Sequence, residues 1–474
     1  MRQLSGLDNS FLAFESGVTY GHVTSLAIFE PGETTMTYER VRDLVAERLH
    51  LLAPFRRRLV TVPLGLDHPY WIDDPDFDLE YHVRHIAVPP PGNARQLAEL
   101  AAELAARHLD RSHPLWEMYF VEGLEDGAVA ELTKIHHACI DGVSGAEILG
   151  VLLDVAREPP EVAPGESAWE SEREPSQWEM LGRGLLGLVT QPRNGIRLAR
   201  RTVPRLGAVM RNFSLALPSQ RRPRELLSVP LTKAPRTPLN GTISPHRRFA
   251  FGSLPLGDAK FVKDRLAGTV NDVVMTMCAG ALRRWLLAHD ALPGAPLLAM
   301  VPVSVRTDEQ RGTFGNRISV MIAELPTNEP DPVHRFHLMR DEMRVAKEQH
   351  HAIPAELLQD FAQFTPPSVL GMASRLATRV KIANRVNPPF NVVISNVPGP
   401  QFPLYSAGAM LRGIYPLSAI TDGVGLNMTL MSYNGHLDFG LLASREMMPD
   451  IERLVDHLAE ELTTLVKVAA AERD

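Results

Sequence analysis

The sequence predicts an α/β protein built from two lobes of mixed sheets and flanking helices, joined by a linker. Strand-like and helix-like stretches alternate on both sides of a polar segment, which is the pattern expected of such lobes. The chain has 474 residues, more than one hydrophobic core usually serves. The composition changes after Ala156, because residues 157–176 are rich in Pro, Glu and Ser and offer little to bury. We therefore expect lobes at residues 1–157 and 244–474 and a linker at 158–243.

The composition favours a cytoplasmic protein. Its net charge of −7 gives no general attraction to nucleic acid or anionic lipid, so any basic surface must be local. Cys139 and Cys278 lie far apart in apolar stretches, which favours free buried thiols in a reducing compartment. The N-terminus lacks the features of a signal peptide, and the longest uncharged run, residues 386–411, contains five prolines. We expect no transmembrane segment.

The first lobe is predicted to begin with a strand at residues 19–30 and a helix at 38–52. A second helix is expected at residues 94–109, where apolar residues again recur at helical spacing. A strand from Trp116 should then pair with the following strand through a turn at 125–127. Trp116 itself is a candidate for the core and equally for a substrate contact.

The stretch from Lys134 to Leu149 predicts the end of a strand, a turn and the start of a helix. Alternation along residues 128–137 would place His136 and His137 on opposite faces of the strand. Asp141–Gly142 is typical of a turn, and Ser144 with Glu147 forms a capping box for a helix at 148–155. A histidine would thus be held at a rigid strand end, where its imidazole suits general-base chemistry.

Two other interpretations of the histidine pair are a satisfied pair of core side chains and a metal site. The metal interpretation is disfavoured, because adjacent histidines on a strand diverge. The chain also has no H-E-x-x-H motif and no cysteine cluster to complete a set of ligands. We expect no metal.

A basic amphipathic segment follows the polar stretch, since no acidic residue occurs between Met180 and Arg224. Within it, residues 182–187 match the dinucleotide pattern G-x-G-x-x-G, but no strand precedes them and we reject the match. The segment could be a helix at a membrane surface, a basic patch for the phosphates of a substrate, or a solvated arm packed against a lobe. The candidates for membrane contact are Arg197, Arg200, Arg201 and Arg205.

The second lobe is again predicted to be α/β. Thr269 should cap a helix that runs to about His289, with Asp272 in its first turn and Asn271 at its N-terminus. Such a position suits recognition of a carbonyl or phosphate, although plain capping is an alternative. Further strands are expected at 297–305, 318–325, 390–395, 424–432 and 437–443, and further helices at 331–351, from 354, at 370–384 and at 450–468.

A set of motifs in a fixed order resembles one enzyme superfamily. His136-His137-Ala-Cys-Ile-Asp141-Gly142 is similar to the H-H-x-x-x-D-G signature of CoA-dependent acyltransferases and condensation domains. In its full set of motifs the chain resembles the bacterial wax ester synthase/diacylglycerol acyltransferases, in particular the actinobacterial triacylglycerol synthases. The supporting motifs are Pro114–Trp116, Thr237–Gly241, Asn271–Val274, Pro302–Arg306, Gly315–Asn316 and Ser395–Pro400.

The resemblance implies two lobes like chloramphenicol acetyltransferase, with the histidine motif at their junction and a tunnel between them. It implies that His137 is the general base that deprotonates an acceptor hydroxyl, which then attacks an acyl-CoA thioester without a covalent acyl-enzyme. His136 would support the strand. Asp141 would be structural and paired with Arg306, next to Gly142 of the signature.

The same resemblance makes Asn271 and Asp272, together with Trp116, the candidates for binding the substrate or the developing oxyanion. The implied reaction transfers a long acyl chain from acyl-CoA to diacylglycerol, with fatty alcohols as second acceptors, and needs no cofactor. The implied partners include an anionic membrane or lipid-droplet surface on the cytoplasmic side, but no nucleic acid. Two alternative functions are a condensation domain that uses a carrier protein and a non-catalytic lipid-body protein.

Overall fold

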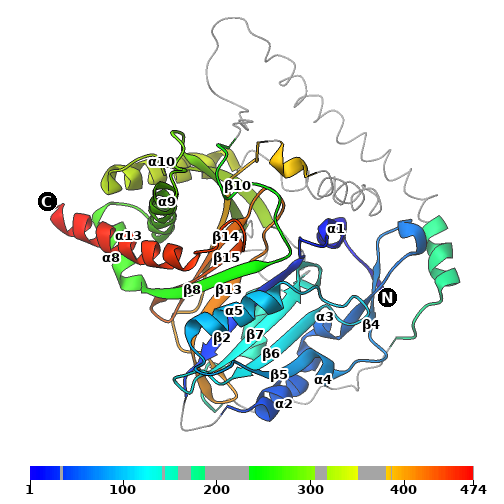
Figure 1. Cartoon of the computed structure of the whole chain (residues 1–474). Helices are drawn as coiled ribbons and strands as arrows, with labels where there is room; N and C mark the ends of the chain where they lie inside the picture. Colours follow the sequence, from blue (N-terminus) through cyan, green and yellow to red (C-terminus); the bar gives the residue numbers. More distant parts are fainter. Residues whose placement is uncertain are drawn as a thin grey trace, which may run out of the picture.

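The computed structural model describes residues 1–31, 36–140, 145–158, 172–186, 234–304, 318–350, 381–385 and 387–472. Its main body consists of two six-stranded sheets, each covered by helices, and these form two lobes that lie side by side (Figure 1). The predicted α/β class and the two lobes are therefore confirmed.

The first lobe is a mixed sheet with helices on both faces. On one face α5 (Ala94–Ala105) buries Leu97 and Ala101, and on the other α2 (Tyr38–Arg48) buries Val41 and Val45. In spatial order, the strands are β12 (Tyr405–Ser406), β13 (Ala409–Leu417), β2 (His22–Phe29), β7 (Val129–His136), β6 (Trp116–Glu122) and β5 (Val83–Ala87).

The second lobe has a mixed sheet with helices packed on one face in a single large core. Its strands, in spatial order, are β10 (Ile318–Leu325), β9 (Leu297–Ser304), β11 (Val392–Pro398), β14 (Leu426–Tyr433), β15 (His436–Ser444) and β8 (Arg247–Pro255). Its helices include α8 (Leu256–Arg265), α9 (Val270–Ala288), α10 (Pro332–His350) and α13 (Glu452–Ala471).

Strand β13 joins the two lobes. It lies late in the sequence but pairs antiparallel with β2 of the first lobe. It also crosses β15 closely, since a Cβ on Gly440 would lie 1.9 Å from the carbonyl oxygen of Pro416. The carboxylate of Asp438 in β15 accepts a hydrogen bond from the N–H of Ile414 in β13 (3.0 Å). The sheet of the first lobe therefore includes β12 and β13, which lie after residue 244 in the sequence, and the predicted division of the chain at 244 stays a prediction.

A third, small sheet flanks the first lobe and consists of β1 (Arg2–Gln3), β4 (Tyr70–Asp73) and β3 (Arg57–Val60). The turn η2 (Pro63–Gly65) links β3 to β4, and residues 177–186 form a helix that packs beside them (Figure 1). This helix lies inside the predicted linker. Short helical segments complete the lobe: α1 (Gly6–Phe14), η1 (Leu49–Leu51), α3 (Ala53–Arg56), α4 (Leu79–His82), η3 (His137–Ile140) and α6 (Gly145–Leu152), with η5 (Ile382–Asn384) in the second lobe.

Local signals in the sequence predict the helix α9 accurately. The hydroxyl of Thr269 accepts a hydrogen bond from the N–H of Asp272 (3.2 Å), and the carboxylate of Asp272 accepts one from the N–H of Thr269 (2.8 Å). Thr269 is thus the N-cap, as predicted, and its reciprocal bonding with Asp272 forms a capping box that satisfies N–H groups without a partner within the helix. The predicted free thiols are also confirmed, because Cys139 and Cys278 are both unpaired and buried.

Candidate active site

The two histidines lie where β7 ends and the 3₁₀ turn η3 begins. Strand β7 ends at His136, and His137 is the first residue of η3, so the strand ends one residue earlier than predicted. The alternation of faces therefore does not extend to His137. The N–H of His137 donates to the carbonyl oxygen of Gly21 (2.9 Å), and the N–H of His136 donates to that of Leu115 (3.0 Å). The backbone of the pair is thus fixed by the residues that directly precede the two neighbouring strands, β2 and β6.

The imidazole of His137 packs on the N-terminal helix α1. Its ring stacks on Phe11 with centroids 4.7 Å apart and an angle of 17° between the planes. Helix α1 starts at a cap, because the hydroxyl of Ser5 accepts a hydrogen bond from the N–H of Asp8 (3.2 Å). The His137 side chain keeps partial access to solvent. Stacking thus restrains the ring without enclosing it completely.

The ring of His136 is buried and braces the turn that carries His137. Its Nδ1 accepts a hydrogen bond from the backbone N–H of Ala138 (3.0 Å). A neutral His136 must therefore carry its proton on Nε2, which lies 3.4 Å from Oε1 of Glu15. The side chain of His136 consequently links the residue after His137 to a carboxylate at the end of α1. The supporting role of His136 in catalysis stays a prediction.

Glu15 is the centre of this bracing cluster. Its Oε1 accepts a hydrogen bond from the N–H of Gly21 (2.9 Å), and its Oε2 lies 2.6 Å from Nη2 of Arg111. Space at the cluster is limited, because a Cβ on Gly21 would lie 2.5 Å from Nε2 of His136. A larger residue at position 21 would displace the ring, so glycine is required there.

The electrostatics keep His137 in its basic form. Burial, together with the neighbouring His136, lowers the pKa of His137 to about 4. Burial raises the pKa of Glu15, but hydrogen bonds from His108, His136 and Arg111 outweigh it and hold the pKa well below its usual range. At neutral pH the cluster therefore presents an unprotonated imidazole at position 137, above an ionised carboxylate that faces His136.

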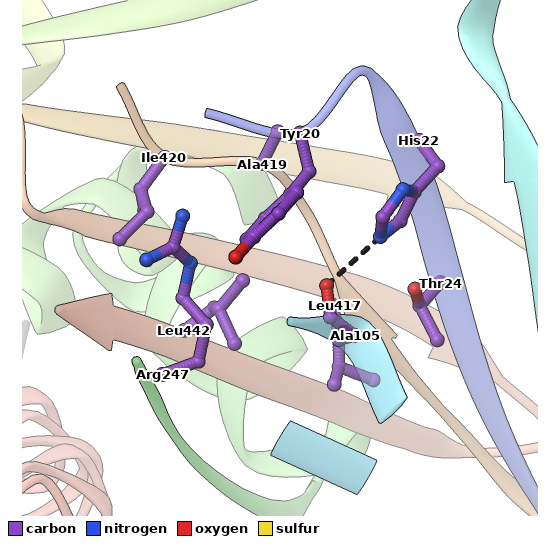
Figure 2. Close-up of a pocket in the computed structure, with 9 residues that line it drawn as sticks. All are labelled: Tyr20, His22, Thr24, Ala105, Arg247, Leu417, Ala419, Ile420 and Leu442. Atoms are coloured by element: carbon purple, nitrogen blue, oxygen red, sulfur yellow. Dashed lines mark hydrogen bonds between the residues drawn. The ribbon is translucent and has the colours of Figure 1, made fainter. Parts of the chain in front are cut away.

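Figure 2 shows a pocket at the junction of the lobes, lined by residues from both of them. Arg247 of β8 extends from the second lobe and lies 4.7 Å from the ring of Tyr20 in the first, where it also donates to the carbonyl oxygen of Val18. The hydroxyl of Tyr20 donates in return to the carbonyl oxygen of Pro245 (3.0 Å). His22, which pairs in register with His136, lines the pocket. These contacts hold the two lobes together beside the histidine motif.

Trp116 is part of the core. Its side chain is fully buried, and its indole N–H donates to the carbonyl oxygen of Phe55 (2.8 Å). The indole is stacked on the rings of Phe55, at 4.4 Å, and His82, at 4.5 Å. Of the two roles predicted for Trp116, the structure supports the core aromatic, because the only polar atom of the ring already has a partner.

Asn271 and Asp272, at the start of α9, have different surroundings. The carboxylate of Asp272 is buried and engaged with Thr269 in the helix cap, and its predicted substrate contact stays a prediction. Asn271 is partly exposed, and its Oδ1 accepts a hydrogen bond from Nδ2 of Asn396 in β11 (3.2 Å). The amide of Asn271 is thus oriented by the Ser395–Pro400 motif. Its predicted role at the thioester stays a prediction.

Several predicted residues lie outside the described residues: Asp141 and Gly142 of the signature, Arg306, and the basic candidates Arg197, Arg200, Arg201 and Arg205. Their roles therefore stay predictions. In the described part of the chain, no group of three or more His, Cys, Asp or Glu side chains is arranged to hold a metal ion. No helix among these residues is both long and apolar enough to cross a membrane.

Comparison with protein families covers most of the chain. Residues 4–274 match the wax ester synthase/diacylglycerol acyltransferase catalytic domain, and residues 314–466 match the C-terminal domain of the same proteins. The chain belongs to this family. The first match contains the histidine turn, Glu15 and the whole capping motif Thr269–Asp272, so the cluster described above lies within the part of the chain that matches the catalytic domain.

Individual relatives align with almost the whole chain. A protein of Mycobacterium tuberculosis named as a probable diacylglycerol O-acyltransferase is 38% identical over 468 residues, covering 97% of each chain. The O-acyltransferase WSD of Acinetobacter baylyi is 33% identical over 485 residues, covering 100% of this chain and 99% of that one. The solved wax ester synthase/diacylglycerol acyltransferase of Marinobacter aquaeolei VT8 is 31% identical, with a TM-score of 0.69 and coverage of 99% and 100%.

A more distant likeness concerns the fold alone. The starter condensation domain of rhizomide synthetase shares the fold with a TM-score of 0.50 at 13% identity, covering 99% of this chain and 95% of that domain. The predicted two-lobed fold is therefore confirmed.

The sequence alone did not indicate the residues that brace the histidine turn. Glu15, Phe11 and Arg111 all contact the motif or its neighbours from positions far from it in sequence. The helix that carries Phe11 has a local signal, since Ser5 and Asp8 form a capping pattern before apolar residues. Glu15 has none, because its partner His136 is brought to it only by the fold.

Proposed function

We propose that this protein transfers a long acyl chain from acyl-CoA to the hydroxyl of diacylglycerol, forming triacylglycerol, and accepts long-chain alcohols as second acceptors. The observation that carries the proposal is the neutral imidazole of His137 on a braced turn, with a pKa lowered to about 4, in a chain of this family. The names of its relatives as diacylglycerol O-acyltransferase and O-acyltransferase support the choice of reaction and of acceptor.

In the proposed mechanism, His137 accepts the proton of the acceptor hydroxyl as the oxygen attacks the thioester carbon. The tetrahedral intermediate then collapses, the carbon–sulfur bond breaks, and the imidazolium of His137 returns the proton to the leaving thiolate of CoA. The products are an ester and free CoA, and no acyl-enzyme forms. An imidazole that is neutral at working pH can perform both proton transfers.

The other residues have supporting roles in this proposal. Glu15 and His136 hold the turn so that His137 keeps one orientation, which matters because small displacements of a catalytic group reduce the rate strongly. Asn271 is the candidate donor for the developing oxyanion, and Asp141 with Arg306 is proposed to fix the loop after the histidines. The reaction changes no oxidation state, so its two substrates suffice and we propose no cofactor.

The proposed site of action is a lipid surface, because diacylglycerol and long alcohols reside in membranes and droplets. We place the enzyme at the cytoplasmic face of a membrane or on lipid droplets, with peripheral association. The basic residues of the segment after Met180 are proposed to contribute attraction to anionic lipid.

The test is an assay of the purified protein with palmitoyl-CoA and, in parallel, diacylglycerol, hexadecanol or water as the acceptor. We expect triacylglycerol and wax ester, with little free fatty acid. Turnover only with an acyl carrier protein as donor would identify a condensation domain instead. Absence of any acyl transfer in a folded protein would favour a non-catalytic lipid-body protein.

A further inference from the structure

The helix at residues 177–186 presents apolar side chains to solvent. Met180 is 1% exposed and Gly184 is buried, so these residues form the face that packs on the protein. On the other side, Trp178 is 81% exposed and Leu185 is 52% exposed. Since residues 178 and 185 are seven apart, they lie on one stripe of the helix, with Gly182 between them. The outward stripe is thus more apolar than a surface helix requires.

The helix is firmly held on the protein. Met180 packs into a cluster with Val60, Val62 and Ile72 of the small sheet and the turn after it. A Cβ on Gly184 would lie 2.7 Å from Cγ1 of Val62, so the helix backbone approaches this turn closely. Its start is also fixed, because Ser176 and Glu179 form a reciprocal cap. The exposed stripe is therefore presented by a rigid support.

A third exposed apolar side chain lies on the turn against which the helix packs. Leu64 is 83% exposed and has a left-handed backbone conformation, with φ of 60°. This conformation is unfavourable for a leucine, and the turn nevertheless directs the side chain outward. A Cβ on Gly184 would meet Val62 and Leu66, which stand on either side of Leu64, so the turn that carries Leu64 lies beside the end of the helix. Trp178, Leu185 and Leu64 together are called the apolar projection below.

The charges around the apolar projection are largely neutralised. Glu174 pairs with Arg58 and Glu179 pairs with Arg173, both at 2.6 Å, while Glu172 pairs with the N-terminal amine (2.5 Å). Arg183 is exposed, and its guanidinium lies 5.9 Å from the ring of Tyr70. The acidic side chains of the segment would therefore not repel an anionic leaflet, and a cation remains at the base of the projection.

The size and shape of the apolar projection favour lipid over a protein partner. Three side chains expose on the order of a few hundred Å². Each partner in a stable protein complex buries about 800 Å². Tryptophan and leucine on a rigid convex support are, by contrast, suited to insertion at the boundary between headgroups and acyl chains.

We propose that the apolar projection docks the enzyme on a lipid surface that contains diacylglycerol. This proposal rests on the proposed function, because only a lipid-dissolved acceptor gives such docking a catalytic purpose. Docking through apolar insertion depends little on salt and does not require anionic lipid. In this respect it differs from the attraction proposed for the basic segment after Met180, which salt would weaken.

The test is flotation of the full-length protein with vesicles of phosphatidylcholine and diacylglycerol, at low and high salt. We expect the wild type to float at both salt concentrations. The variant with Trp178→Ser, Leu185→Ser and Leu64→Ser should bind these vesicles at least about tenfold more weakly. As a matched control, Leu287→Ser changes a leucine that is 50% exposed on α9 of the second lobe, and it should float like the wild type.

A second readout uses the fluorescence of Trp178. The difference in emission between the wild type and Trp178→Phe should shift to the blue when these vesicles are added, and lipid brominated in the acyl chain should quench it. Unchanged flotation of the triple variant, or no shift for Trp178, would overturn the proposal. Loss of a dimer in the triple variant, measured by sedimentation, together with unchanged flotation, would assign the surface to a second copy of the chain.

An activity assay separates this proposal from the proposed function. With a water-soluble short alcohol as the acceptor, the triple variant should match the turnover of the wild type. With diacylglycerol in vesicles, it should be about tenfold slower at limiting lipid. If the wild type esterifies neither acceptor, the proposed function fails while flotation still decides the docking. If both proteins use vesicle-borne diacylglycerol equally, the docking proposal fails while the function stands.

Discussion

Replacement of Glu15 by Gln tests whether the bracing cluster positions His137. Glutamine has nearly the same shape, and its oxygen can still accept the N–H of Gly21 (2.9 Å). The charge that faces Nε2 of His136 and Nη2 of Arg111 is lost, however. The Glu15 side chain is only 7% exposed, so solvent screens this loss weakly.

The magnitude follows from the contacts of the carboxylate. A hydrogen bond to a charged group contributes about 1.5–3 kcal/mol. If the orientation of His137 depends on one such contact, its loss reduces the fraction of molecules with His137 in the catalytic orientation by about ten- to a hundredfold. A difference of about 1.4 kcal/mol corresponds to a factor of ten. We therefore expect kcat to fall by this factor. The KM for acyl-CoA should change little, since Glu15 lies behind the turn and contacts His136.

The assay is steady-state esterification of hexadecanol by palmitoyl-CoA, with thermal melting of the same samples. The matched control is Glu103→Gln, which removes a carboxylate that is 64% exposed on α5 and should leave kcat unchanged. A Glu15→Gln variant with the kcat of the wild type would refute the positioning role. A fall in kcat/KM with an unchanged kcat would assign Glu15 to substrate binding instead.

Three further predictions follow from the charges. Burial raises the pKa of Glu131 to about 7, so the free energy of unfolding should fall by up to about 3 kcal/mol as pH rises from 4.5 to 7. Denaturant unfolding at pH 5 and 8 measures this fall, and the Glu131→Gln variant should not show it. Because the pKa of His137 is lowered to about 4, kcat/KM should stay level from pH 8 to about 5, and an inflection near 6.5 would contradict this. Glutamine in place of four arginines should remove the salt-dependent part of flotation with anionic vesicles: Arg197, Arg200, Arg201 and Arg205. The expected loss of binding free energy is about 1 kcal/mol for each of these residues that faces the lipid.

The elements predicted best are those whose signals are local. Strand β10 was predicted at its observed bounds because apolar residues in a short run between turns define a buried strand. The cap of α9 was predicted because threonine is a preferred N-cap residue and Asp272 follows in the first turn of the helix. Such signals lie within a few neighbouring residues, so they can be recognised without knowledge of the rest of the fold.

Other features depend on contacts that no local pattern records. Strand β13 contains Gly413 and Pro416 and pairs with β2 from the other end of the chain, so neither composition nor neighbours indicated it. Similarly, Glu15 meets His136 only after α1 folds against the turn. The identity of His137 as a candidate base followed from the motif, whereas its orientation and lowered pKa follow from burial and from Phe11.

The most direct test of the central claim is the initial rate of triacylglycerol formation by His137→Ala. The measurement uses acyl-CoA and diacylglycerol at neutral pH, beside the wild type and with a thermal melt of each protein. Loss of a general base reduces a rate by about two to four powers of ten, and we predict this loss in a variant that remains folded. Turnover near that of the wild type would contradict the role of His137 as the base.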